Sequence, residues 1–126
     1  MSNPIHVPSY KVVIAGSRTI TDKKLLDDAI HESGFDISEV ISGTARGVDQ
    51  LGEQWAQEHN IPIRKFPADW TKYGKSAGYR RNEEMIIYVY QNRGAVIALW
   101  DGSSLGTQHT IDLAKKYKIP IYIKTI

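Results

Sequence analysis

The stretch that decides the fold is residues 11–15 (KVVIA), which run directly into Gly16-Ser17-Arg18. A short β-branched run that ends at a glycine is typical of a buried parallel strand leaving its sheet through a tight turn. The pattern returns at residues 40–41 before Gly43, and at residues 95–100 (AVIALW), the most apolar run of the chain. These repeats predict a parallel sheet whose strands open into glycine-rich loops.

Segments with helical spacing separate these strands. Thr21 is expected to cap a first helix that stops at Gly34, and Asn60 to close a second helix that begins near Val48. Two more helices are expected at residues 77–91 and 107–117, further strands at 61–66 and 119–123, and an irregular connection at 67–76. Strand and helix alternate five times, which predicts a Rossmann-like α/β fold of three layers with a five-stranded parallel sheet in the order 3-2-1-4-5. Residues 10–126 are expected to form one domain, after a tail at residues 1–9.

Composition narrows the class of protein. The chain has 126 residues, is 41% hydrophobic and contains no cysteine, so a disulfide framework, a thiolate nucleophile and a zinc–thiolate site are excluded. The four histidines share no metal-ligand spacing, and we expect neither a metal nor a cofactor. A net charge of +2 is too small to mark a dedicated duplex-DNA binder. Without a basic leader or an apolar run of about 20 residues, the protein is expected to be cytoplasmic and to have no membrane contact.

The expected ligand site follows from the sheet. In such folds ligands bind beyond the carboxyl ends of the strands, where the strand order reverses, here between the first and fourth strands. Three loops reach that edge, and each feeds the amino terminus of a helix, where N–H groups and the helix dipole favour a phosphate. The chain lacks the G-x-G-x-x-G motif of standard dinucleotide enzymes. The loop residues predicted to bind the ligand are Gly16, Ser17, Arg18, Gly43, Thr44, Arg46, Gly47, Asp101, Gly102, Ser104, Gly106 and Thr107.

The helix at residues 77–91 is expected to add two polar side chains. Arg81 stands four residues before Met85, and Asn82 four before Ile86, so both lie beside the buried stripe and should point toward the same edge. Arg80 is expected instead to form a solvated i,i+4 pair with Glu84.

Aromatic and basic residues mark the long connection before this helix. Trp70 and Tyr73 lie there with Lys72 and Lys75, and Tyr79 follows. Such a segment suits stacking on a base and closing over the ligand as a lid. In the alternative reading, Trp70 plugs the edge of the core, since tryptophan is highly buried on average.

Four strings carry a family resemblance: VIAGSR, ISGTARGVDQLGEQWA, FPADWTKYGKSAGYRRNEEM and ALWDGSSLGTQHTIDLAKK. They resemble the YspA-like, YpsA-related branch of the SLOG superfamily, often carried by bacteria and phages, over about residues 11–124. The resemblance implies a Rossmann-like fold and a site for nucleotide-derived ligands, and it adds Asp49 to the site residues above.

The wider superfamily includes the Lonely Guy phosphoribohydrolases, which cleave the N-glycosidic bond of nucleoside monophosphates, and nucleotide sensors of antiphage systems. Those hydrolases carry an arginine that resembles Arg81 and a glutamate two residues after the Gly-Thr pair of a P-G-G-x-G-T motif. This chain has His109 at the glutamate position, and residues 101–104 (DGSS) replace the P-G-G segment. An oxocarbenium-like transition state needs a carboxylate, and Asp49, Asp101 or Glu83 could take the place of the missing glutamate. The candidate catalytic residues are Asp49 and Glu83, together with Arg81 and His109.

Three functions remain open. The leading hypothesis is binding of a nucleotide or nucleotide-derived signal, by a sensor or sequestering protein. The alternatives are a nucleoside 5′-monophosphate N-glycosidase and a module that binds single-stranded nucleic acid. The helix at 77–91 is apolar on nearly every side, which predicts a homodimer or higher homo-oligomer through it.

Overall fold

The computed structural model describes residues 9–126 as a five-stranded parallel sheet in the order β3-β2-β1-β4-β5. The strands are Ser9–Gly16 (β1), Asp36–Ser42 (β2), Ile63–Lys65 (β3), Gly94–Trp100 (β4) and Ile121–Thr125 (β5). The helices are Lys23–Ser33 (α1), Val48–Glu58 (α2), Trp70–Tyr73 (α3), Ala77–Gln91 (α4) and Leu105–Lys116 (α5), with a 3₁₀ turn at Gly74–Ser76 (η1). The predicted fold class and strand order are confirmed.

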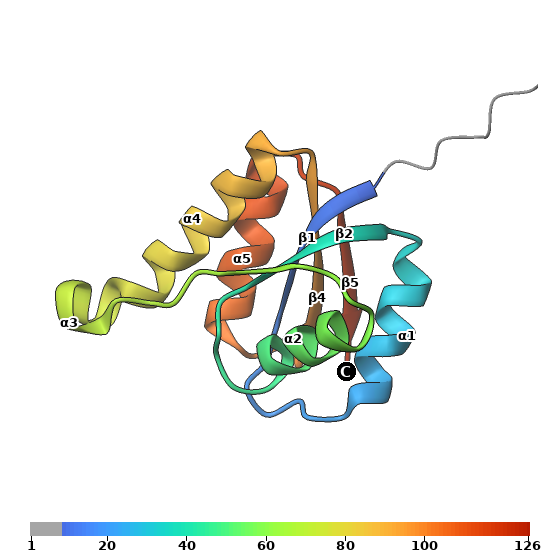
Figure 1. Ribbon diagram of the computed structural model, residues 1–126. Coiled ribbons are helices and arrows are strands. Elements are labelled where there is room, and N and C mark those ends of the chain that lie inside the picture. The colour runs from blue at the N-terminus through green and yellow to red at the C-terminus, as the bar shows by residue number, and fades with distance from the viewer. Residues whose placement is uncertain (1–8) are drawn as a thin grey trace, which may run out of the picture.

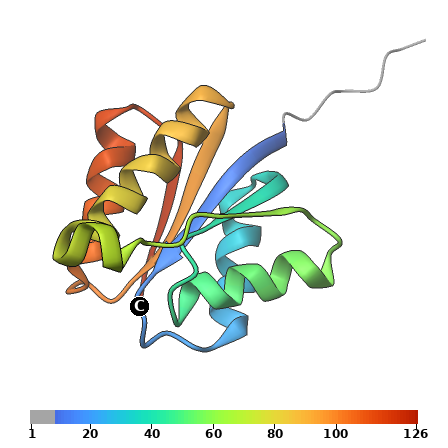
Figure 2. The same ribbon diagram turned by 60° about the vertical axis from the view of Figure 1, so that its left-hand side comes forward.

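The sheet is covered on both faces. Helices α1 and α2 pack on one face, and α4 and α5 pack on the other (Figure 2). Successive side chains of β1 point to opposite faces of the sheet and so contribute to both hydrophobic cores. Val12 and Ile14 point toward α1 and α2, whereas Val13 and Ala15 point toward α4. Burial on both faces explains why β4 is apolar throughout.

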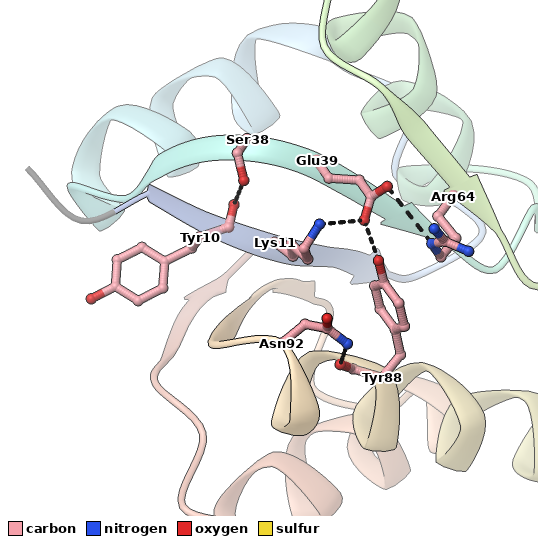
Figure 3. Close-up of polar contacts among 7 residues, drawn as sticks. All are labelled: Tyr10, Lys11, Ser38, Glu39, Arg64, Tyr88 and Asn92. Carbon is pink, nitrogen blue, oxygen red and sulfur yellow. Dashed lines mark hydrogen bonds and ion pairs between the residues drawn. The ribbon is translucent and has the colours of Figure 1, made fainter.

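A polar cluster fixes α4 on the sheet. The Glu39 carboxylate of β2 accepts a hydrogen bond from the Tyr88 hydroxyl of α4 at 2.7 Å. Lys11 of β1 and Arg64 of β3 approach the same carboxylate at 3.4 and 3.7 Å (Figure 3). Arg81 lies two helical turns before Tyr88 on α4, so this cluster also orients the helix end that carries Arg81.

Two helix starts differ from the prediction. The N-cap of α1 is Asp22, not Thr21, and its carboxylate accepts from the Lys24 amide at 3.0 Å. Helix α5 begins at Leu105, two residues earlier than expected, because the Ser104 hydroxyl caps it. Gly34, with a φ of 70°, ends α1 as predicted.

Other boundaries also moved. The predicted strand at 61–66 pairs with β2 only at Ile63–Lys65, and the last strand begins at Ile121, two residues later than predicted. The connection at 67–76, predicted to be irregular, contains α3 and η1. Helix α2 has its C-cap at His59 rather than Asn60. Of the predicted tail at residues 1–9, only Ser9 is described, and it begins β1; the rest lies outside the described residues.

Hydropathy gives one further result. Every helix within residues 9–126 is too short or too polar to span a bilayer.

Candidate functional site

Three loops meet at the carboxyl edge of the sheet. They follow β1, β2 and β4, and Figure 1 shows them at the same end of the molecule as the start of α5. β1 pairs with β2 on one side and with β4 on the other, so the chain order reverses between β1 and β4. This is the position at which open parallel sheets bind their ligands.

The end of β1 is packed too tightly for any residue other than glycine. A Cβ at Gly16 would stand 2.3 Å from the Leu99 carbonyl and 2.6 Å from Cγ2 of Val48. The next residue, Ser17, is buried and joins two loops, since its amide donates to the Leu99 carbonyl and its hydroxyl accepts from the Asp101 amide at 3.2 Å. The end of β1 therefore holds the loop that follows it against the end of β4 and the loop after β4.

The loop between β2 and α2 folds over a buried carboxyl group. Asp49 is 7% exposed, and its Oδ2 accepts from the Ala45 amide at 3.1 Å. Burial raises the pKa of Asp49 to about 6, against the opposing effects of the Ala45 amide and the Arg81 guanidinium. Thr44 and Gly47 take positive φ angles of 61° and 75° in this loop.

Arg81 reaches across from α4 to this loop. Its Nη1 donates to the Gly43 carbonyl, and its Nε donates to Oδ1 of Asn82 at 2.9 Å. A Cβ at Gly43 would stand 2.8 Å from both Arg81 Nη1 and Asp49 Oδ2, so the glycine leaves room for the two charged groups. Burial lowers the pKa of Arg81, although the guanidinium stays charged at neutral pH.

Asn82 joins α4 to α5. It is 6% exposed, and while its Oδ1 accepts from Arg81, its Nδ2 donates to the Gly106 carbonyl and to Nδ1 of His109, both at 3.3 Å. Burial lowers the pKa of His109, which agrees with a neutral ring accepting at Nδ1. Asn82 thus holds Arg81 in place rather than presenting a free amide.

The loop between β4 and α5 satisfies most of its own polar groups. Oδ1 of Asp101 accepts from the amides of Ser103 and Ser104 at 2.9 and 2.8 Å, which holds the pKa of this carboxyl below its usual value. The hydroxyls of Ser104 and Thr107 lie 3.0 Å apart and bond to each other. A Cβ at Gly106 would meet no atom within 4 Å, so the backbone of the first turn of α5 is open to an approaching group.

The loops enclose a cavity of about 330 Å³, here called the inner cavity. Arg18 and Arg81 supply its positive charge, and Asp49 and Asp101 supply its carboxyl groups. The predicted site residues that line it are Gly16, Ser17, Arg18, Asp49, Arg81, Asn82, Asp101, Ser104, Gly106 and Thr107.

Two more cavities adjoin it at Arg18 and Arg81. The outer cavity, of about 330 Å³, is lined by these arginines and by the predicted residues Gly43, Thr44, Arg46 and Trp70. The side cavity, of about 200 Å³, lies between Trp70 and Gly106. Arg46, Arg81 and Gly106, which come from three separate loops and helices, therefore line neighbouring cavities that have Arg18 and Arg81 in common.

Some predicted residues lie elsewhere. Tyr73 lines a further cavity of about 230 Å³, which shares Arg81 with the others but is not lined by Arg18. Gly47 and Gly102 shape turns at positive φ, Glu83 is exposed on α4, and His109 is half-buried against Asn82 and Tyr79.

One prediction and one alternative reading beside the site were wrong. In the described part of the chain Arg80 forms no ion pair with Glu84; it donates to Oγ of Ser76 at 3.2 Å and stacks on Tyr73. Trp70 is 52% exposed and does not plug the core.

Sequence reasoning missed Thr19, Ala45 and Thr110, which line the inner cavity. Thr110 carries a recognisable signal, because it stands one helical turn after Gly106 and its hydroxyl donates to the Gly106 carbonyl at 3.2 Å. Ala45 takes part through its amide, which no side-chain pattern reveals.

Comparison with known proteins identifies the family of the chain. The family model described as YspA, cpYpsA-related SLOG family matches residues 10–73. The Gene 61 protein of Mycobacterium phage D29 is 34% identical over 120 residues, covering 88% of this chain and 93% of the phage protein. No solved structure matches the chain. The resemblance inferred from the motifs is confirmed: the chain belongs to the YspA, cpYpsA-related SLOG family.

Proposed function

We propose that this protein binds a phosphate-containing nucleotide, or a nucleotide-derived signalling ligand, in the inner cavity, and acts as a sensor or sequestering protein. The observation that carries the proposal is the convergence of Arg18, Arg81 and the open backbone at Gly106 on one cavity at the switch point of the sheet. Membership of the SLOG family supports a nucleotide-type ligand.

Arg81 is the proposed phosphate anchor. Its bonds to the Gly43 carbonyl and to Asn82 hold the guanidinium at the junction of the three cavities. A held guanidinium loses little conformational freedom when it binds an oxyanion, and its planar fork matches two phosphate oxygens. Arg18, which is exposed and lines the same cavities, adds a second positive charge from the opposite loop.

Asp49 favours a ligand that carries a sugar as well as a phosphate. A buried carboxyl group in a cavity repels a bare anion, but it accepts hydrogen bonds from hydroxyl groups. Two arginines and one carboxyl group therefore suit a phosphate joined to a ribose, with the phosphate near Arg81 and a hydroxyl near Asp49. The loop residues around them are the proposed contacts to the remaining phosphate oxygens.

The test compares nucleoside 5′-phosphates with the matching nucleosides by isothermal titration calorimetry. Wild-type protein is expected to bind the phosphates and to bind the nucleosides far more weakly. Arg81→Gln is expected to lower the affinity for the phosphates about 10- to 150-fold, which corresponds to the free energy of one hydrogen bond to a charged group. Arg80→Gln is the matched control, because Arg80 contacts Ser76 and Tyr73 instead of the inner cavity.

Two results would contradict the proposal. Equal affinity for nucleosides and their phosphates would show that the phosphate is not recognised, and failure of every nucleotide to bind would remove the function altogether. Thermal denaturation of each variant separates a lost contact from a lost fold.

A second candidate, N-glycosidic hydrolysis of a nucleoside 5′-monophosphate, is favoured by the buried carboxyl of Asp49 beside Arg81. Water would attack C1′ of the ribose as the C1′–N bond breaks, so that ribose 5-phosphate forms and the base leaves with one proton of the water. The Asp49 carboxylate would stabilise the positive charge that develops on the sugar. Incubation with a panel of nucleotides, followed by chromatography, tests it. Base release that Asp49→Asn abolishes would support hydrolysis, and intact nucleotides throughout would rule it out.

A further inference from the structure

Three aromatic side chains stand beside the site, and Trp70 is the most exposed of them. Tyr73 is covered by cations, with Arg80 Cζ at 4.4 Å and Lys72 Nζ at 5.1 Å from its ring centroid. The ring of Tyr79 meets His109 edge-on at 4.7 Å. Trp70 is 52% exposed, and within residues 9–126 its indole has neither a cation nor an aromatic ring stacked on it.

The Trp70 indole is nevertheless held in position. Helix α3, which it begins, is capped by the Asp69 carboxylate, which accepts from the Lys72 amide at 3.0 Å. The far end of the indole leans on the first turn of α4, where Cη2 stands 3.4 Å from the position of a Cβ at Gly78. A large ring that is anchored at one edge and half-exposed has the geometry of a stacking surface.

Trp70 also lies at the correct place for a ligand that enters the inner cavity. It lines the outer and the side cavity, and Arg18 and Arg81 line both of these as well as the inner cavity. A ligand with its phosphate at Arg81 therefore has Trp70 next to the part that extends outward. Arg18 shares both cavities with the indole, so its guanidinium is available for the second face of a planar group.

We propose that Trp70 is the stacking platform for the base of the bound nucleotide. The proposal rests on the proposed function and extends it to the ligand class: the site selects nucleoside phosphates over sugar phosphates and inorganic phosphate. Every base has an aromatic face, so stacking on Trp70 separates ligands with a base from ligands without one, and separates the four bases from each other much less.

The experiment measures binding of AMP, GMP, CMP and UMP against ribose 5-phosphate by isothermal titration calorimetry. Wild-type protein is expected to bind the nucleotides more tightly than ribose 5-phosphate. Trp70→Leu is expected to lose about 5- to 150-fold for the nucleotides and less than about twofold for ribose 5-phosphate. Trp70→Phe should restore most of the nucleotide affinity, and Tyr10→Leu, at a half-buried aromatic residue at the opposite end of β1 from Gly16, is the control.

Fluorescence gives a second measurement that a purely structural role would not change. A base stacked on Trp70 quenches indole emission, so nucleotides should quench wild-type protein and should quench Trp70→Phe much less, although that variant still binds. The emission of Trp70→Phe comes from Trp55 and Trp100, so any quenching that persists in this variant measures their share.

The possible failures are distinguishable. If ribose 5-phosphate binds as tightly as the nucleotides, or Trp70→Leu weakens both classes equally or neither, the stacking proposal is overturned while the phosphate site stands. If neither class binds wild-type protein, the proposed function falls and the stacking proposal falls with it.

Discussion

Replacing Asp49 with asparagine should change how stability depends on pH. Burial raises the pKa of Asp49 from 3.8 to about 6, so the folded protein holds this proton more tightly than the unfolded chain does. The stability that the protonated carboxyl contributes is present below about pH 4 and is lost as the pH rises through 6. At about 1.4 kcal/mol for each pKa unit, the loss amounts to about 3 kcal/mol by pH 7.5.

Asparagine stays neutral and keeps an oxygen that accepts from the Ala45 amide. The free energy of unfolding of Asp49→Asn minus that of wild type should therefore rise by about 3 kcal/mol between pH 4 and pH 7.5. Urea denaturation of both proteins at several pH values measures this difference, since all other titrating groups are shared. Asp36→Asn, at an exposed carboxylate in β2, controls for the loss of one negative charge. A difference that stays flat or falls with pH would refute the reasoning.

Anion binding offers a second measurement on the same variant. Sulfate keeps its charge over this pH range, whereas a phosphate monoester itself titrates near pH 6. Because the ionised Asp49 lines the same cavity as Arg81, sulfate should bind wild-type protein more weakly at pH 7.5 than at pH 5. Asp49→Asn should bind it equally at both. Wild-type affinity that does not change with pH would show that Asp49 does not face the anion.

Three further predictions follow from the packing. Gly43→Ala places a Cβ 2.8 Å from Arg81 Nη1 and Asp49 Oδ2. Nucleotide affinity should therefore fall, and denaturation should show a decrease of about 1–3 kcal/mol in the free energy of unfolding. Unchanged binding would contradict this. The Cβ added by Gly106→Ala meets no atom within 4 Å, so the stability of α5 should rise by about 0.4–1 kcal/mol. Calorimetry should nevertheless show weaker nucleotide binding, and unchanged affinity would place the ligand elsewhere. Helix α4 exposes Ile87 and Tyr90, so light scattering at micromolar concentration should show a dimer that Ile87→Lys disrupts, and a wild-type monomer would refute the interface.

The elements that sequence analysis predicted best are those whose pattern is local. The helix at 77–91 has the predicted bounds. Its periodic pattern is long and lies between a turn and Gly94, so there are few other residues at which the helix could begin or end. Short elements depend on their neighbours instead. The alternating run at 61–66 is uniform in sequence, but only Ile63–Lys65 forms a strand in register with β2, and Pro62 and Phe66 add one backbone bond each at its ends. Thr21 and Asp22 are both good caps, and only the path of the chain selects Asp22.

The sequence predicted which edge of the sheet carries the site, but it did not predict which side chains contact one another there. Glycine-rich loops and the strand order place the cavity, whereas the orientation of each side chain depends on residues distant in the sequence. Asn82 lines the inner cavity as expected, but its amide is already bonded to Arg81, Gly106 and His109. The stacking of Arg80 on Tyr73, which covers that ring, also depends on how α3 meets α4.

The most direct test of the central claim is an NMR titration of ¹⁵N-labelled protein with nucleoside 5′-phosphates. Binding in the inner cavity predicts saturable shifts of the amide signals of Ser17, Arg18, Ala45 and Gly106, with smaller changes in α1 and β5. Shifts confined to another surface, or an unchanged spectrum at millimolar nucleotide, would contradict the account.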